Sequence, residues 1–157
     1  DSVEVAAALT YRAVRAGARL FNGITVEDMV HREDRVAGVV INWHAVMLNN
    51  WHVDPLTVIS SFVLDATGHN ALLTSKLTRK AGVRLDTPTG DIIGERPMWA
   101  EQGERDTVEN TRQVYPGLYV SGMAANGVFG SCRMGPIFGG MFLSGRKAAY
   151  LINEELG

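Results

Sequence analysis

The stretch NNWHVDPLTVISSFVLDATGH, residues 49–69, places chemically active side chains at both ends of an apolar run. His52 and Asp54 precede the run, and His69 follows it. The residues between them, TVISSFVLDA (57–66), are β-branched and apolar, which predicts one interior β-strand. Either the two ends of this stretch belong to one chemical site, or they are only the polar ends of a buried strand.

The length of the run limits how its ends could share a metal ion. Imidazole and carboxylate together suit a divalent transition metal such as iron(II). If Val58–Asp65 is extended, its steps of about 3.3 Å span roughly 23 Å, whereas a ligand lies about 2 Å from a bound ion. Asp54 and His69 would then be too far apart within one chain, so a metal here predicts an oligomer. The alternative is that Asp54 lies in a turn before Pro55 and that His69 caps the next helix.

The segments on either side predict an α/β domain with an antiparallel β insertion. Upstream, the patterns predict a helix over 1–17, a short strand ARLFNG (18–23) and a hairpin of ITVEDMV (24–30) and RVAGVVINWHAVM (35–47). Downstream, they predict a helix over 70–81 capped by Asn70 and Gly82, an irregular segment over 83–112, a buried strand GLYVSG (117–122) and a final helix from Pro136.

Composition restricts the class of protein. Of the 157 residues, 46% are hydrophobic and 20% are charged, a balance typical of a globular domain. The formal net charge of −2 gives no electrostatic argument for nucleic-acid binding. No apolar stretch approaches the roughly 18 residues of a membrane span. Cys132 is the only cysteine, which excludes an intrachain disulfide and agrees with a cytoplasmic location.

Glycines cluster between Gly117 and Gly145, where they permit positive φ angles and a close approach of the backbone to a ligand. Arg133 lies in this segment and could hold a carboxylate or phosphate through two parallel hydrogen bonds, or it could simply be exposed. Met123 follows the GLYVSG strand, at the end of which α/β sheets bind ligands, although packing is the alternative. The acidic and basic run EQGERD (101–106) predicts a solvated loop.

One expected feature is missing. No strand, glycine-rich turn and helix of the dinucleotide-binding type precede Gly117. We therefore expect residues 1–157 to form a single α/β domain that lacks an N-terminal dinucleotide-binding half.

Five motifs together resemble the thiamine thiazole synthase family in its archaeal and bacterial form. They are FNGITVEDMV (21–30), RVAGVVINW (35–43), HVDPLTV (52–58), DATGH (65–69) and RMGPIFGGMFLSG (133–145). HVDP followed by DATGH and RMGP is the specific combination. The resemblance covers essentially the whole chain and implies the C-terminal part of a glutathione-reductase-type, FAD/NAD-binding, Rossmann-like fold, usually assembled as a homo-octamer.

The resemblance also implies an iron(II)-dependent transferase of thiamine biosynthesis. NAD would be consumed as a substrate. Its adenylated ribose portion, after loss of nicotinamide, would condense with glycine and a sulfur source to give an adenylated thiazole carboxylate.

The resemblance assigns roles to individual residues. Asp54 and His69 match the iron ligands, which adjacent protomers contribute, and Arg133 matches the residue that holds the glycine carboxylate. The positions that line the adenylated substrate match Val26, His52, Val53 and Met123.

His52 carries the catalytic assignment. Eukaryotic members have a cysteine here that gives up its own sulfur, which histidine cannot do, so the resemblance implies the branch that uses free sulfide and turns over repeatedly. Two alternatives are also compatible with the sequence. One is an isomerase of ribose 1,5-bisphosphate, because Arg133 could bind phosphate, and the other is a non-catalytic fragment of a flavin-fold protein.

Overall fold

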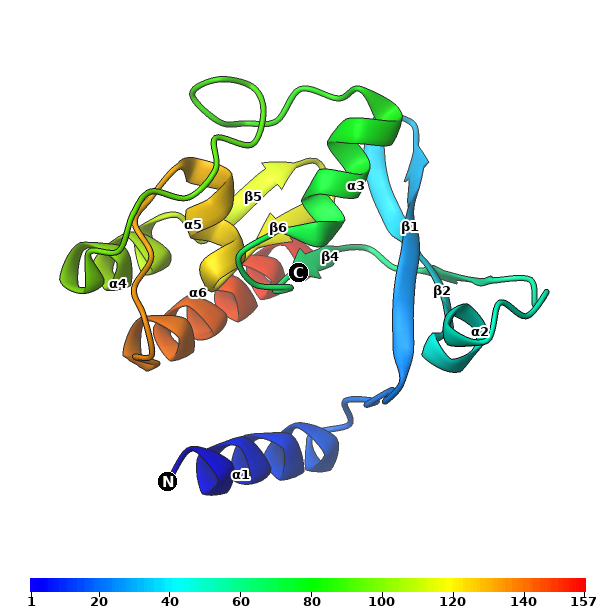
Figure 1. Cartoon of the computed structure of the whole chain (residues 1–157), viewed down its shortest axis with the longest axis horizontal. Coiled ribbons are helices and arrows are strands. Elements are labelled where there is room, and N and C mark those ends of the chain that lie inside the picture. Colours follow the sequence, from blue (N-terminus) through cyan, green and yellow to red (C-terminus); the bar gives the residue numbers. More distant parts are fainter.

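The computed structural model describes residues 1–157 and contains two small sheets and six helices (Figure 1). The helices are α1 (Ser2–Arg15), α2 (His44–Leu48), α3 (Leu72–Ala81), α4 (Ala100–Glu109), α5 (Met123–Phe129) and α6 (Gly139–Leu156). The strands are β1 (Ile24–Arg32), β2 (Arg35–Trp43), β3 (Leu56–Ile59), β4 (Val63–Asp65), β5 (Arg112–Tyr115) and β6 (Leu118–Val120). This agrees with the expected α/β class with an antiparallel insertion.

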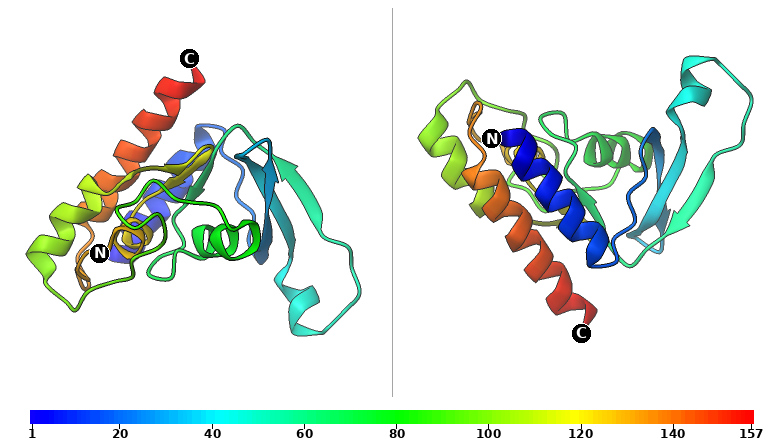
Figure 2. Two further views of the ribbon diagram at one scale, coloured as in Figure 1. Left: turned by 90° about the horizontal axis from the view of Figure 1, so that it is seen from above. Right: turned by 90° about the horizontal axis from the view of Figure 1, so that it is seen from below.

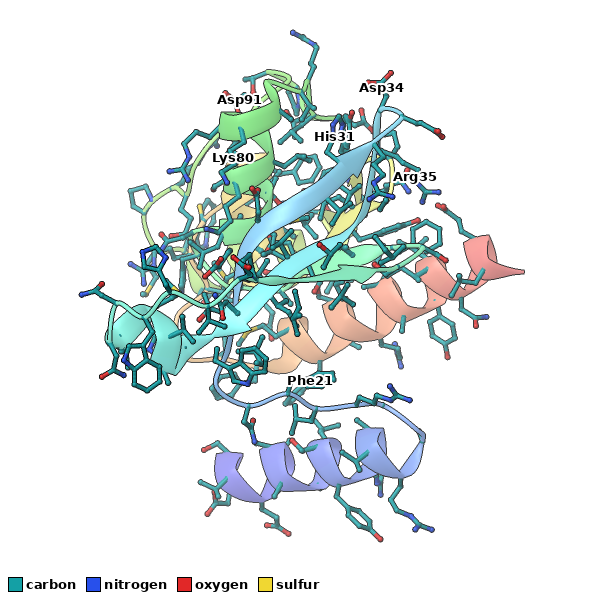
Figure 3. All side chains as sticks on the ribbon, turned by 90° about the vertical axis from the view of Figure 1, so that its right-hand side faces the viewer. Phe21, His31, Asp34, Arg35, Lys80 and Asp91 are labelled. Atoms are coloured by element: carbon teal, nitrogen blue, oxygen red, sulfur yellow. The ribbon has the colours of Figure 1, made fainter.

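The first sheet is antiparallel, with strand order β1-β2-β3. Its hairpin turn is made by Glu33 and Asp34, whose φ angles are 50° and 55°. Two adjacent residues with positive φ are typical of the tight turns that match the twist of a hairpin. Figure 3 shows Asp34 at this turn, at the tip of the two long strands. The predicted hairpin is confirmed over β1 and β2, but its second strand ends at Trp43 and does not reach Met47, because His44–Leu48 forms the short helix α2.

The second sheet has strand order β4-β6-β5, in which β4 and β6 are parallel and β5 is antiparallel to β6. All three residues of β6 are buried, so the prediction of a buried strand in GLYVSG is confirmed. Figure 2 shows α6 on one side of this sheet and α3 on the other. The main hydrophobic core has 13 residues and lies mostly around this second sheet. Its members are Met29, Val36, Val63, Ala71, Leu73, Leu77, Leu85, Val114, Leu118, Val120, Ala124, Ala125 and Val128.

The single interior strand predicted over 57–66 is wrong, because the segment forms two strands that belong to different sheets. β3 pairs with β2, whereas β4 pairs with β6. All four residues of β3 are exposed, and burial begins only at Val63. β-Branched residues suit any pleated surface, so their run alone cannot distinguish one strand from two. The estimate of 23 Å assumed a continuous strand and does not describe this segment.

Three further predictions of secondary structure are wrong. EQGERD lies in α4, which was missed because the residues it buries, Gly103 and Thr107, form no apolar stripe. The segment 18–23 forms no strand. Pro136 does not open the final helix, which begins at Gly139.

The helix predicted over 70–81 ends at Gly82 as expected but begins at Leu72, so Asn70 is not its cap. The first turn is instead held by Thr67, whose Oγ1 accepts a hydrogen bond from the backbone nitrogen of Leu72 at 2.7 Å. A capping residue five positions before the helix lies outside the usual sequence signature.

The predicted first helix is confirmed as α1, and Asp1 caps it by accepting a hydrogen bond from the backbone nitrogen of Val3 at 2.7 Å. None of its residues is buried. Figure 1 shows α1 separated from both sheets, and Figure 3 shows Phe21 on the segment that joins it to β1. No helix of the chain combines the length and apolar character that crossing a bilayer requires.

Candidate functional site

A pocket of about 650 Å³ opens where the two parallel strands β4 and β6 end. The residues that line it after β4 are Ala66, Gly68 and His69, and those after β6 are Ser121, Gly122 and Met123. The far wall comes from Gly135, Pro136 and Phe138 and from α6 through Met141 and Gly145. Ligands of α/β sheets bind beyond the carboxyl ends of parallel strands, so this pocket is the candidate site.

The DATGH motif is folded around Asp65, the last residue of β4, which is fully buried. Its Oδ1 accepts hydrogen bonds from the backbone nitrogen and the hydroxyl of Thr67, at 3.1 and 2.7 Å. Its Oδ2 accepts from the backbone nitrogen and the hydroxyl of Thr74, both at 2.8 Å. Asp65 therefore fixes the turn that carries His69 and anchors the first turn of α3.

His69 and Arg133, which are far apart in the sequence, share one carboxylate. The Nδ1 atom of His69 is hydrogen-bonded to Oε1 of Glu95. The Oε2 atom of Glu95 lies 3.9 Å from Nε of Arg133. The Glu95 side chain is only 17% exposed, compared with 45% for His69 and 51% for Arg133.

Backbone hydrogen bonds hold the Glu95 and Arg133 segments side by side. The amide of Arg96 donates to the carbonyl of Ser131 at 3.0 Å, and the amide of Arg133 donates to the carbonyl of Arg96 at 3.3 Å. Glu95 was missed by sequence reasoning because it lies in an irregular segment without periodicity. Its one sequence signal is an acidic residue after a glycine, which is too common to be specific.

His52, Val53 and Asp54 lie elsewhere, in an exposed loop between α2 and β3. The side chain of Asn42, which is buried in β2, donates a hydrogen bond from Nδ2 to the carbonyl of Val53 at 3.1 Å. The amide of Trp51 donates to the carbonyl of Val46 at 3.1 Å. The loop is therefore anchored at two points, although its side chains face solvent.

Val26 lies on β1 and packs partly against the hydrophobic core. None of Val26, His52, Val53 and Asp54 lines the pocket that contains His69 and Met123.

The chain alone does not assemble a metal site. No group of three or more His, Cys, Asp or Glu side chains is arranged to bind an ion. The donor types nevertheless fit iron(II), because the imidazole of His69 keeps one ring nitrogen unbonded and the carboxylate of Asp54 is exposed. His69 lines the pocket beside the second sheet, whereas Asp54 lies in the loop before β3 of the first sheet.

Comparisons with known proteins point to one family. The model of the Thi4 family matches residues 1–138. The chain is 54% identical over 157 residues to the thiamine thiazole synthase of Thermococcus kodakarensis and also to that of Pyrococcus furiosus, matching 100% of this chain and 60% of each relative. A crystal structure of THI4 from Thermovibrio ammonificans superposes with a TM-score of 0.95 at 52% identity, covering 99% of this chain and 61% of that one. The chain thus spans about 60% of the length of the curated relatives it matches.

Proposed function

The chain belongs to the Thi4 family, and from this membership we propose that it is part of an enzyme of thiamine biosynthesis. The proposed reaction forms an adenylated thiazole carboxylate from NAD, glycine and sulfide, with iron(II) bound. The observation that carries the proposal is the pocket beyond β4 and β6, which has His69 and Met123 in its wall and Arg133 nearby, in a chain 54% identical to two thiamine thiazole synthases.

The same relatives do not favour the two alternatives. The relatives from Thermococcus kodakarensis and Pyrococcus furiosus are both named thiamine thiazole synthase, which supports neither a ribose 1,5-bisphosphate isomerase nor a non-catalytic fragment. We further propose that the two sheets belong to a larger glutathione-reductase-type fold. The superposition on Thermovibrio ammonificans THI4 supports a common fold with that part of that protein.

The proposal gives each polar group one task. The guanidinium of Arg133 would hold the glycine carboxylate through a bidentate pair, for which its planar geometry is suited. His69, together with Asp54 of a neighbouring chain, would hold iron(II). When bound, the metal supplies a Lewis-acid site that can bring sulfide to an electrophilic carbon.

The loop and the apolar residues would hold the nucleotide. Met123, Val26 and Val53 offer apolar surface to the adenylated portion of NAD. The imidazole of His52 could act as a general acid or base. It has no sulfur to give, so sulfur would have to enter from solution and each protein molecule could turn over repeatedly.

The two proposed iron ligands lie beside different sheets, which supports a site shared between chains. His69 lies at the second sheet, whereas Asp54 lies in the loop that enters β3 of the first sheet. We therefore propose a homo-oligomer, of the octameric kind that the family resemblance implies, in which the metal bridges two protomers.

The test is a reconstitution with the full-length protein under anaerobic conditions. NAD, glycine, sulfide and iron(II) are expected to yield more than one adenylated thiazole carboxylate per protein chain, measured by mass spectrometry. Omitting sulfide should stop product formation, because His52 has no sulfur atom to supply in its place. Absence of product with all components present would contradict the proposal, and conversion of ribose 1,5-bisphosphate instead would favour the isomerase.

A further inference from the structure

We infer that Glu95 is a positioning residue that sets the orientation of His69 and Arg133 toward the pocket. The inference rests on the proposed function, because that function gives the imidazole and the guanidinium their ligands. Glu95 itself would touch neither the substrate nor the metal.

The hydrogen bond to Glu95 determines which nitrogen of His69 is available. An ionised carboxylate only accepts hydrogen bonds, so Nδ1 of His69 must carry the hydrogen. In the neutral ring the lone pair is then on Nε2, on the opposite side of the imidazole. Metal-binding histidines generally donate their second ring nitrogen to a carboxylate or a carbonyl in this way, which fixes both tautomer and ring orientation.

The other oxygen of the same carboxylate serves Arg133. Glu95 Oε2 lies 3.9 Å from Nε, the innermost nitrogen of the guanidinium, and no other acidic side chain forms an ion pair with Arg133. Attraction at Nε leaves the two terminal nitrogens free. Those nitrogens form the second edge on which a guanidinium can bind another carboxylate.

Glu95 is held firmly enough to act on both neighbours. The backbone amide of Gly94 donates to the carbonyl of Gly127 at 2.9 Å, and the amide of Arg96 donates to the carbonyl of Ser131 at 3.0 Å. On the other side, a Cβ atom at Gly127 would lie 2.8 Å from the carbonyl oxygen of His69. Because Gly127 has no side chain, α5 can approach the His69 turn and the Glu95 segment closely at once.

The test compares E95A and E95M with E95Q. E95A and E95M remove the acceptor, and E95M keeps most of the side-chain volume if E95A leaves a destabilising cavity. E95Q keeps a carbonyl oxygen that can accept from Nδ1–H but loses the negative charge. E101A, on the exposed first turn of α4, is the matched control.

Two measurements are made on each variant of the full-length protein. The ¹⁵N shifts of the His69 ring report the tautomer, and the His31 ring, whose Nε2 is bonded to the Tyr115 hydroxyl at 2.9 Å, is an internal reference. A titration with iron(II) alone reports metal affinity. E95A and E95M are expected to release the Nδ1–H tautomer and weaken iron binding by about 10–100-fold, whereas E95Q keeps the tautomer and E101A changes neither.

The effect of Glu95 on glycine binding through Arg133 is measured separately, by steady-state kinetics. Loss of the Glu95 charge should raise the KM for glycine more than it lowers kcat, in E95Q as well as in E95A, because Arg133 loses its fixed partner. Unchanged His69 shifts and iron affinity in E95A and E95M, with affinity lost in H69A, would overturn the inference. If the shifts and affinity change as expected but the wild-type protein makes no thiazole, the proposed function fails while the positioning role of Glu95 remains.

Discussion

The two sheets of this molecule differ in how far their apolar side chains are buried. The sheet of β4, β5 and β6 is covered by helices, and most of the hydrophobic core lies in these strands together with α3 and α5. The sheet of β1, β2 and β3 ends in the wholly exposed edge strand β3, and α1 before it buries no residue. We call these the packed region (63–157) and the open region (1–62). Large exposed apolar patches generally mark interaction surfaces.

This difference in packing coincides with a division of the candidate site. His69, Glu95, Met123 and Arg133 lie in the packed region, where Glu95 is hydrogen-bonded to His69 and forms an ion pair with Arg133. Asp54, with His52 beside it, lies in the open region on an exposed loop. The packed region therefore holds its candidate residues through internal contacts, whereas the side chains of the candidate residues in the open region face solvent.

The largest effect expected from this contrast is on stability. Leu118 is fully buried in β6, and Leu56 is 51% exposed on β3. L118A should lower the free energy of unfolding by about 2–5 kcal/mol because it leaves a cavity. L56A should change that of the isolated protomer by less than about 0.5 kcal/mol. Chemical denaturation of both variants measures the difference, and equal losses would break the comparison.

Asp65 tests whether the packed region orders its half of the site. D65A removes the acceptor of four hydrogen bonds, two from Thr67 and two from Thr74, and leaves the donors of the fully buried Thr74 without a partner. We expect a loss of about 2–3 kcal/mol in unfolding free energy and increased amide hydrogen exchange from Ala66 to Thr74. D91A, on an exposed carboxylate, is the control. Wild-type exchange in D65A would show that the turn does not depend on this carboxylate.

Asn42 tests the anchoring of the open half. N42A removes the hydrogen bond to the carbonyl of Val53 and should cost about 1–2 kcal/mol, because Asn42 is buried. The larger change should be local, with faster exchange and a shifted fluorescence of Trp51 in the loop. N49A removes an exposed hydrogen bond on α2 and should leave both unchanged. Amide exchange in N42A as slow as in the wild type would mean that contacts other than the Asn42 hydrogen bond hold the loop.

The smallest effect concerns the link between the two regions. Lys80 of α3 forms an ion pair with Asp28 of β1, and this hydrogen bond is the main cause that lowers the pKa of Asp28 below 3.8. A lowered carboxyl pKa stabilises the fold above the unfolded pKa, and that stability is lost as the pH falls through the folded pKa. Both side chains are more than a third exposed, so the contribution should be less than about 1 kcal/mol.

A comparison of the wild type with K80M in low salt measures this link. Their unfolding free energies should differ near neutral pH and converge as the pH falls through the lowered pKa of Asp28, where this carboxylate becomes protonated. A difference that does not depend on pH would mean that Lys80 acts through packing.

How much of this could be predicted from the sequence depended on the kind of signal. The hairpin, β6 and α1 were predicted because their turn residues, apolar run and cap are local. The break at residues 60–62 was not, since a switch between sheets depends on pairing partners distant in sequence. α5 was missed because its glycine and alanines carry no amphipathic pattern, although all but one of its residues are buried.

The candidate site follows the same division. His69 and Met123 could be singled out by residue type and by their position after strands, and Arg133 by its guanidinium in the glycine-rich segment. Glu95 could not, because its role depends on an irregular segment that only the folded chain brings beside them.

Hybrid complementation tests most directly whether a complete site needs the open half of one chain and the packed half of another. D54A and H69A are each expected to lose tight iron(II) binding and thiazole formation. When the two are co-expressed and purified as mixed oligomers, about a quarter of the shared sites should contain both Asp54 and His69 under random pairing. Recovery of iron binding and product at about that level is the predicted result. Mixed oligomers as inactive as either parent, or a monomeric D54A variant with full activity, would contradict it.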